Sequence, residues 1–278
     1  GCVAVSNGLE PINDSEVLRR MMEYAYTCGM SVLLYCEDAS LKNDGVAHEG
    51  TVSMSLGLPG IPETAETIAI NRAILLAEQS QNKLHICRLS TARGIDMVNN
   101  AKARGLAVTA DVSIQHLYLT EHDIENFNAQ CHLRPPLRTV VDRDALLSGI
   151  KEGIIDCICS DHQPHDDDAK CAPFSLTEAG ASSLEHFLPL IINLANQHAI
   201  DLPTLIKTVT NNPASILGIN AGTLSVDAIA DICIFNPSKP LTINSQNMIS
   251  AGKNTPYEGM TLDAQVEKTL VAGKIVYE

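Results

Sequence analysis

The chain has 278 residues, 45% of them hydrophobic and 19% charged, so it can bury a large core and is neither disordered nor fibrous. Its 33 acidic residues outnumber its 19 lysines and arginines, and the net charge of -14 repels nucleic-acid phosphates and anionic membrane surfaces. Because no apolar run approaches the roughly 20 residues of a membrane helix and the first residues lack a secretory-signal pattern, we expect a globular cytoplasmic protein that binds neither nucleic acid nor membranes.

Short apolar runs alternate with longer stretches of helical periodicity over the first 220 residues, a pattern typical of an α/β fold. The apolar runs predict five strands, at residues 2–5, 31–35, 84–87, 107–112 and 154–160. The periodic stretches predict helices at residues 15–29, 65–76, 91–104, 142–152, 182–198 and 202–209, with a further short helix begun by Pro213.

Residues 221–278 differ in composition, with short β-rich pieces at 231–235, 266–271 and 274–277 separated by Gly, Pro and Asn. We therefore divide the chain into an α/β part, residues 1–220, and a small β domain, residues 221–278. Five βα units fit either an open doubly wound sheet or most of an eight-stranded (β/α)8 TIM barrel. No strand is followed by a GxGxxG or Walker pattern, which weakens the nucleotide-binding version. A barrel would lack three N-terminal strands, so we expect the natural gene product to be longer.

Ligand sites of parallel α/β folds lie at the carboxyl ends of the strands. The strongest candidate there is the run from Asp161 to His165, which places a carboxylate and two imidazoles directly after the fifth strand. A rigid strand end can hold such groups as a metal ligand or a general base. The alternative is a turn aspartate flanked by surface histidines.

This run, Asp-His-Gln-Pro-His, resembles the Asp-His-Ala-Pro-His signature of dihydroorotases in the amidohydrolase superfamily. Other segments occur in the same order as in that family: Tyr35-Cys36-Glu37-Asp38 with His48-Glu49-Gly50, Gly57-Leu58-Pro59-Gly60 with Glu66, Leu84-His85-Ile86, His116-Leu117, Pro135-Pro136-Leu137-Arg138, Asn212-Pro213-Ala214 and Asn254-Thr255-Pro256-Tyr257. The resemblance covers nearly the whole chain and favours dihydroorotases over hydantoinases and allantoinases.

The resemblance implies a (β/α)8 TIM barrel of amidohydrolase type with a small β domain, in which the five strands would be the fourth to the eighth. It also implies hydrolysis of dihydroorotate to carbamoyl-aspartate by zinc-activated water. The family's zinc ligands are a His-x-His pair on the first strand, a carboxylate after the fourth strand, histidines after the fifth and sixth strands, and an aspartate after the eighth strand that also serves as the base.

Several of these positions hold residues that depart from the family pattern. Asn7 stands where the fourth-strand carboxylate is expected, and Tyr35 and Arg88 replace the fifth-strand and sixth-strand histidines. Arg134 replaces an asparagine that helps to hold substrate. Asp161, at the base position, and His165, on the substrate side, match the family. Because arginine has no lone pair to donate, the resemblance implies a degenerate metal site with no zinc expected.

The same reasoning predicts that Arg88, with a contribution from Arg134, pairs with Asp161 and takes the electrostatic place of the metal. The alternative is that Arg88 extends into solvent. A rebuilt thiolate site of Cys36, Cys87 and His162 is a further option. The remaining assignments are structural: nine scattered cysteines that are mostly buried and reduced, Cys157 and Cys159 as packing groups, His85 as the support of a loop, and His186 and His198 on helix surfaces.

Three functions remain in competition. The leading one is a catalytically inactive dihydroorotase homologue that serves as a structural partner of aspartate transcarbamoylase, and a homo-oligomer is compatible with it. The second is an active zinc-dependent dihydroorotase with an altered metal site. The third is a binding protein that holds dihydroorotate or carbamoyl-aspartate through Arg134, Arg138 and His165 without turning it over.

Overall fold

The computed structural model describes all 278 residues. Its central element is a sheet of five parallel strands in the order β1-β2-β5-β6-β7. The spatial order follows the chain order, without the reversal that defines a doubly wound sheet, so the barrel-type arrangement is the correct alternative. All five predicted strands are present, and their bounds are β1 Ala4–Ser6, β2 Ser31–Tyr35, β5 Leu84–Cys87, β6 Val108–Ser113 and β7 Cys157–Cys159.

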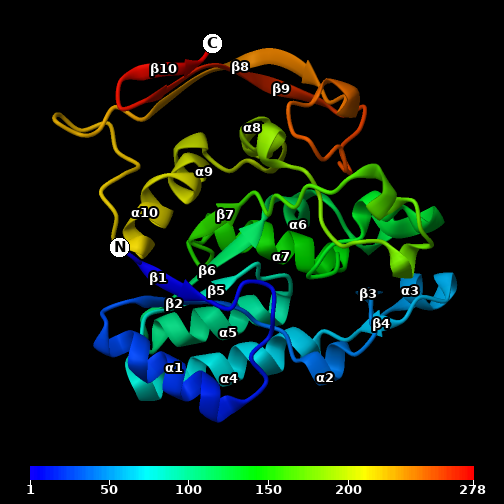
Figure 1. The fold of residues 1–278 in the computed structure, drawn as a ribbon, viewed down its shortest axis with the longest axis vertical. Helices are drawn as coiled ribbons and strands as arrows, with labels where there is room; N and C mark the ends of the chain where they lie inside the picture. The colour runs from blue at the N-terminus through cyan, green and yellow to red at the C-terminus, as the bar shows by residue number, and fades with distance from the viewer.

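The helices that connect these strands lie against the sheet and begin at recognisable caps (Figure 1). In the first helix, the Asp14 side chain accepts hydrogen bonds from the amides of Glu16 and Val17, and Leu18 and Met22 point into the core. The helices over this part of the chain and up to residue 217 are α1 Ser15–Thr27, α4 Thr64–Ser80, α5 Ala92–Ala103, α7 Val140–Lys151, α8 Phe187–His198, α9 Leu202–Val209 and α10 Asn211–Leu217.

Long loops at the carboxyl ends of the strands carry short elements of their own. The strands β3 Ala47–His48 and β4 Gly60–Ile61 form a separate parallel pair, and α2 Ala39–Lys42, α3 Thr51–Leu56 and α6 Ile114–Tyr118 are short helices. A kinked 3-10 segment occupies Glu121–Phe127, and shorter 3-10 turns occupy Ala129–Cys131, Asp167–Lys170, Phe174–Leu176, Leu184–His186 and Ser245–Asn247. These loops provide most of the side chains around the candidate site.

The C-terminal strands form a three-stranded antiparallel sheet in the order β10-β9-β8, and β9 packs on α8 (Figure 1). Their bounds are β8 Ile232–Thr242, β9 Thr261–Val271 and β10 Lys274–Tyr277. The predicted strands at 231–235 and 266–271 are therefore too short. The pairing of β8 with β9 shifts register between Asn236 and Pro240, and this irregularity at a sheet edge accommodates two prolines that the sequence pattern treats as a strand end.

One apolar cluster of 36 buried residues joins the parallel sheet to the helices around it. Burial of an apolar cluster of this kind is the main favourable contribution to folding. A smaller cluster of eight residues supports the loops around β3 and the 3-10 turns. None of the helices combines the length and the apolar character needed to span a bilayer.

Candidate functional site

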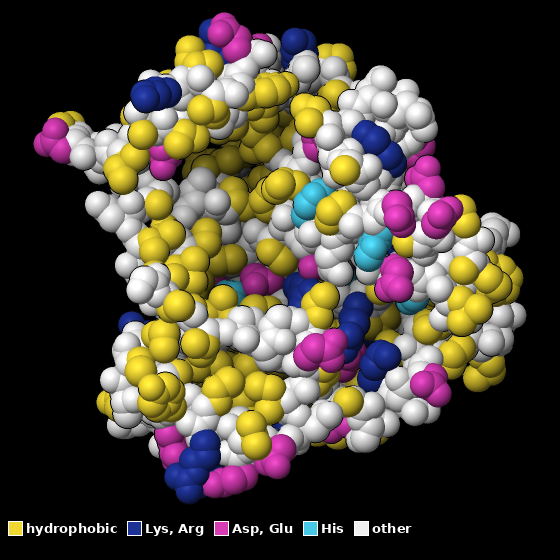
Figure 2. Space-filling model, viewed as in Figure 1, with side chains coloured by type: hydrophobic (Ala, Val, Ile, Leu, Met, Phe, Trp, Pro, Cys, Tyr) yellow, Lys and Arg dark blue, Asp and Glu magenta, His cyan; other side chains and the backbone are white.

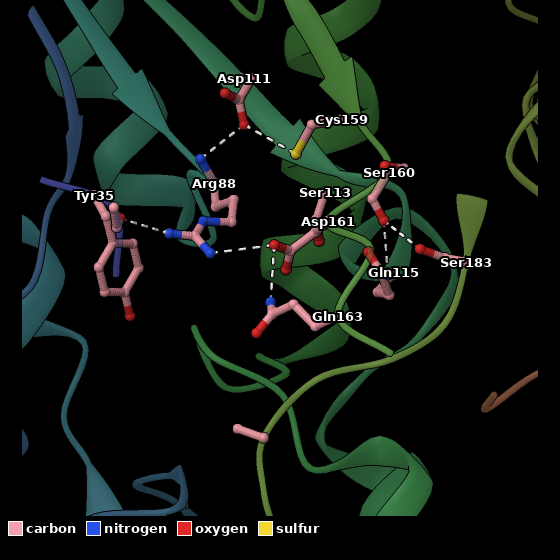
Figure 3. A network of polar contacts seen from close by, with 12 residues as sticks. Tyr35, Arg88, Asp111, Ser113, Gln115, Cys159, Ser160, Asp161, Gln163 and Ser183 are labelled. Atoms are coloured by element: carbon pink, nitrogen blue, oxygen red, sulfur yellow. Dashed lines mark hydrogen bonds and ion pairs between the residues drawn. The ribbon is translucent and has the colours of Figure 1, made fainter. Parts of the chain in front are cut away.

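The predicted site residues Tyr35, Arg88 and Asp161 come together at the carboxyl ends of β2, β5 and β7 (Figure 3). The face of the molecule in Figure 2 is hollowed between the parallel-sheet part and the antiparallel sheet, and hydrophobic side chains line the hollow. The structure therefore places these residues where ligand sites of parallel α/β folds occur.

Arg88 is the centre of the site. Its guanidinium donates a hydrogen bond to Asp161 over 3.1 Å and lies 4.5 Å from the centroid of the Tyr35 ring, a cation–π distance. A further hydrogen bond of 3.3 Å reaches the carbonyl of Gly8. The predicted pair with Asp161 is confirmed, and the alternative of a solvent-directed arginine is wrong, because the Arg88 side chain is only 10% exposed.

Asp161 is held by two donors, since its Oδ1 also accepts a hydrogen bond of 2.9 Å from the Gln163 amide. Burial raises the pKa of this carboxyl above its ordinary value, while the neighbouring Arg88 acts in the opposite direction. Both members of the pair have left-handed backbone angles, with φ of 55° at Arg88 and 43° at Asp161. Such conformations cost about 1–3 kcal/mol each and cluster at functional sites.

Arg134 pairs with a different carboxylate from the predicted one. Its guanidinium donates to Glu37 over 2.6 and 3.1 Å and lies 5.3 Å from the Tyr35 ring centroid. The Tyr35 hydroxyl donates to the same carboxyl group over 2.8 Å. Burial and the adjacent Glu37 raise the pKa of Tyr35 well above its usual value, so the phenol stays protonated. The positive charges of two arginines and the negative charges of two carboxylates thus neutralise each other around the Tyr35 ring.

Both ends of the Asn7 side-chain amide are hydrogen-bonded to backbone groups. Its amide nitrogen donates to the carbonyl of Tyr35 over 3.0 Å, and its amide oxygen accepts from the N–H of Tyr35 over 2.9 Å. The amide nitrogen also reaches the carbonyl of Glu10 at 3.0 Å. The side chain therefore continues the pairing of β1 with β2 and presents no free oxygen to the site.

Arg138 and His165 lie in enclosed surroundings. Arg138 is buried and donates to the Ser90 hydroxyl over 3.1 Å, to His48 Nδ1 over 3.0 Å and to the carbonyl of Ile61 over 3.2 Å. The Nε2 atom of His165 lies 3.1 Å from the carbonyl of Ala179, and its backbone N–H donates to Asn254. Neither side chain is hydrogen-bonded to the cluster of Arg88 and Asp161.

Asp111 and Glu37 are site residues that the sequence analysis did not single out. Asp111 is a buried carboxylate in the middle of β6, and it accepts hydrogen bonds from the Arg88 N–H over 2.8 Å and from the Cys159 thiol over 3.3 Å (Figure 3). An aspartate flanked by Ala110 and Val112 inside a predicted strand was the available signal for it. Glu37 is part of the quoted segment after β2, but nothing in the sequence indicates its partner.

Three histidine assignments change with the structure. His85 was expected to support a loop, but its ring nitrogens lie 2.8 Å from Thr109 Oγ1 and 2.9 Å from Asp111 Oδ2, both on strand β6. His162 lies apart from Cys36 and Cys87, and its Nδ1 accepts from the amides of Ser183 and Leu184, so the thiolate site of these three residues is wrong. The expectation of a surface position for His186 is also wrong, since the residue is buried.

Buried neutral histidines predict a loss of stability in mild acid. Burial lowers the pKa of His48, His116 and His132 from 6.5 to about 4. Below pH 6.5 the unfolded chain binds protons that the folded protein does not, so stability is complete above pH 6.5 and falls as the pH approaches 4. His116, which is 3% exposed, contributes a slope of about 1.4 kcal/mol per pH unit.

Urea unfolding between pH 6.5 and 5 measures this slope, and His116→Gln is expected to make it shallower. An unchanged slope in the variant would assign the pH dependence to other groups.

Comparison with known proteins identifies the family. The model of the amidohydrolase family matches residues 3–276. The chain is 44% identical over 278 residues to a dihydroorotase-like protein of Pseudomonas aeruginosa, 43% identical to one of Pseudomonas putida, and 38% identical to a dihydroorotase of Geobacter sp. strain M21. These matches cover 100% of the chain but only 65–66% of each relative, so the chain spans about two thirds of the length of its curated relatives.

Solved structures agree on the fold. The hydantoinase (dihydropyrimidinase) of Thermus sp. superposes with a TM-score of 0.87 at 21% identity, over 100% of this chain and 64% of that one. The L-hydantoinase of Arthrobacter aurescens gives a TM-score of 0.86 at 24% identity, again over 100% of this chain and 64% of that one. The predicted TIM-barrel fold with a small β domain and the resemblance to dihydroorotases are confirmed, and the chain belongs to the amidohydrolase family.

Proposed function

We propose that this chain belongs to a catalytically inactive dihydroorotase homologue that serves as a structural partner of aspartate transcarbamoylase. The inactive assignment rests on the position of Arg88. Its guanidinium is seated on Tyr35 and paired with Asp161, in the place where the family resemblance puts zinc ligands. A permanent cation there repels a second cation.

The donor set at these positions does not fit a zinc ion. Arg88 has no lone pair, Tyr35 is a protonated phenol, and both ends of the Asn7 amide are used by backbone groups. Zinc catalysis needs about three protein ligands and an open position. Of the carried-over positions in this chain, only Asp161 is a usable ligand, and it is already engaged by Arg88 and Gln163.

Two tests address the proposal. The protein should not hydrolyse dihydroorotate when zinc is supplied in excess, under conditions where a dihydroorotase such as the Geobacter relative turns it over. The protein should also co-elute with the aspartate transcarbamoylase of the same source organism in size-exclusion chromatography. Turnover of dihydroorotate would overturn the inactive assignment. A transferase whose assembly and activity are the same with and without this protein would overturn the partnership.

A second candidate is an active zinc-dependent dihydroorotase. The observation in its favour is that relatives at 37–40% identity, such as those of Geobacter metallireducens and Syntrophus aciditrophicus, are named dihydroorotase. The binding-protein alternative has less support, because Arg138 is buried among protein acceptors and Arg134 is held by Glu37. The odd count of nine cysteines and the acidic composition agree with the cytoplasmic location that we propose.

A further inference from the structure

A second cluster of polar side chains lies within the strands, beneath the Arg88–Asp161 pair. His85 and Cys87 are two residues apart on β5, so they project from the same face of the strand, and Asp111 comes from the adjacent strand β6. One imidazole nitrogen, the thiol sulfur and one carboxylate oxygen of these three residues all lie within 4.8 Å of one another. This is the only group of three such side chains in the molecule with that geometry.

A fourth potential ligand lies beside Asp111. The Cys159 thiol, on β7, lies 3.3 Å from Asp111 Oδ1, and Figure 3 shows it on the far side of that carboxylate from Arg88. The Cys159 sulfur lies more than 4.8 Å from at least one of the donor atoms of His85, Cys87 and Asp111, so it must turn toward them to join the set. His85 and Asp111 are 5% and 8% exposed, so bulk water has little access to the donors.

We propose that His85, Cys87, Asp111 and Cys159 form a tetrahedral site for zinc or a similar borderline-soft divalent ion. One imidazole, two thiolates and one carboxylate are donors that zinc accepts in closed four-coordinate sites. Ligand atoms of such a site are roughly 3–4 Å apart. His85, Cys87 and Asp111 lie within 4.8 Å of one another, and the Cys159 side chain must rotate toward them for the set to close on an ion. The site is separate from the family's metal position, because its ligands come from within the strands and include neither Asp161 nor any residue that follows a strand.

The protons and charges of this binding step balance. Both thiols release a proton to solvent, and His85 remains neutral with its proton on Nδ1, where Thr109 Oγ1 at 2.8 Å accepts it and orients the ring. Zinc with two thiolates and one carboxylate carries a net charge of -1. The backbone N–H of Arg88 donates a hydrogen bond to Asp111 and stabilises the negative charge in the buried site.

A route for the ion exists on the opposite side from the family's site. A cavity of about 280 Å³ reaches His85 and Thr109, and its other walls come from Ser31, Lys83, Leu106 and Ser215. These residues mark the amino ends of β2, β5 and β6 and the adjoining end of α10. His85 is the one proposed ligand that this cavity touches, so the ion would pass His85 to reach the other donors, away from the Arg88–Asp161 pair.

Cobalt titration tests the site with a spectroscopic readout. The full chain, with the exposed Cys2, Cys28, Cys171 and Cys233 replaced by serine to remove accidental thiolates, is titrated with Co²⁺. We expect one equivalent to bind with thiolate-to-cobalt charge-transfer absorption and the intense visible bands of tetrahedral cobalt, both displaced by Zn²⁺. Cys87→Ser and Cys159→Ser in that background should each lose at least half of the charge-transfer absorption while keeping the far-UV circular dichroism of the parent.

Each outcome has one meaning. Absence of thiolate–cobalt absorption in the folded parent, or absorption in both serine variants that equals that of the parent, overturns the site. If one serine variant does not fold, the other and Asp111→Asn give the same comparison.

The result is independent of the proposed function. Cobalt or zinc bound through Cys87 without dihydroorotate turnover supports both inferences. Turnover that survives Cys87→Ser overturns the inactive assignment and leaves the cobalt comparison to decide the site.

Discussion

Replacing Arg88 with alanine is expected to lower the free energy of unfolding by about 3–5 kcal/mol, because it leaves the buried carboxylate of Asp161 without its cation. The two side chains are 10% and 11% exposed, so solvent replaces little of the lost interaction. The same change removes the stacking of the guanidinium on Tyr35. Urea unfolding followed by far-UV circular dichroism measures the loss, since the chain has no tryptophan.

Two further variants make this result specific. Arg93→Ala is the matched control, because Arg93 is 60% exposed and its distance to Glu63 is 3.8 Å, and it should change stability by no more than about 0.5 kcal/mol. Asp161→Asn combined with Arg88→Met should be less destabilised than Arg88→Ala alone, since no unpaired charge remains. An Arg88→Ala loss as small as that of Arg93→Ala would mean that the pair does not support the fold.

Much of the barrel could be predicted because parallel strands buried on both faces are continuous apolar runs. The predicted strands at 31–35 and 84–87 agree with β2 and β5 at both ends. The antiparallel sheet was predicted less well, since the irregular pairing around Pro237 and Pro240 interrupts the apolar pattern while the strand continues. Pairing across a register shift depends on the partner strand, which local sequence does not specify.

The contacts of the candidate site could be predicted where they join residues at the ends of neighbouring strands. They could not be predicted where they join residues of two long loops. Arg88 directly follows β5 and Asp161 comes two residues after β7 of the same parallel sheet, so their proximity follows from topology. The pairing of Arg134 with Glu37 joins positions 97 residues apart through two irregular loops. His186 illustrates the same limit, because only the packing of the antiparallel region and α8 buries a histidine at a helix start.

Glu66 is expected to be as important for stability as Arg88, although it lies outside the charged site. Its carboxylate is buried at the start of α4 and accepts hydrogen bonds from the backbone N–H groups of Ser90 and Thr91 and from both of their hydroxyls, with 2.7 Å to Thr91 Oγ1. It thereby fixes the turn between β5 and α5, the same turn that positions Arg88. Ser90 in turn accepts a hydrogen bond from Arg138.

Glu66→Ala should therefore lower the free energy of unfolding by about 3–5 kcal/mol, because each buried donor left without a partner costs about 1–3 kcal/mol. Glu66→Gln should be less damaging, since its amide oxygen still accepts one or two of these bonds. Glu63→Ala, one turn earlier and partly exposed, is the control. Hydrogen exchange at the amides of Ser90 and Thr91 distinguishes the mechanism: exchange must accelerate there in Glu66→Ala well below the unfolding midpoint, and protection equal to that of the parent would show that other groups hold the turn.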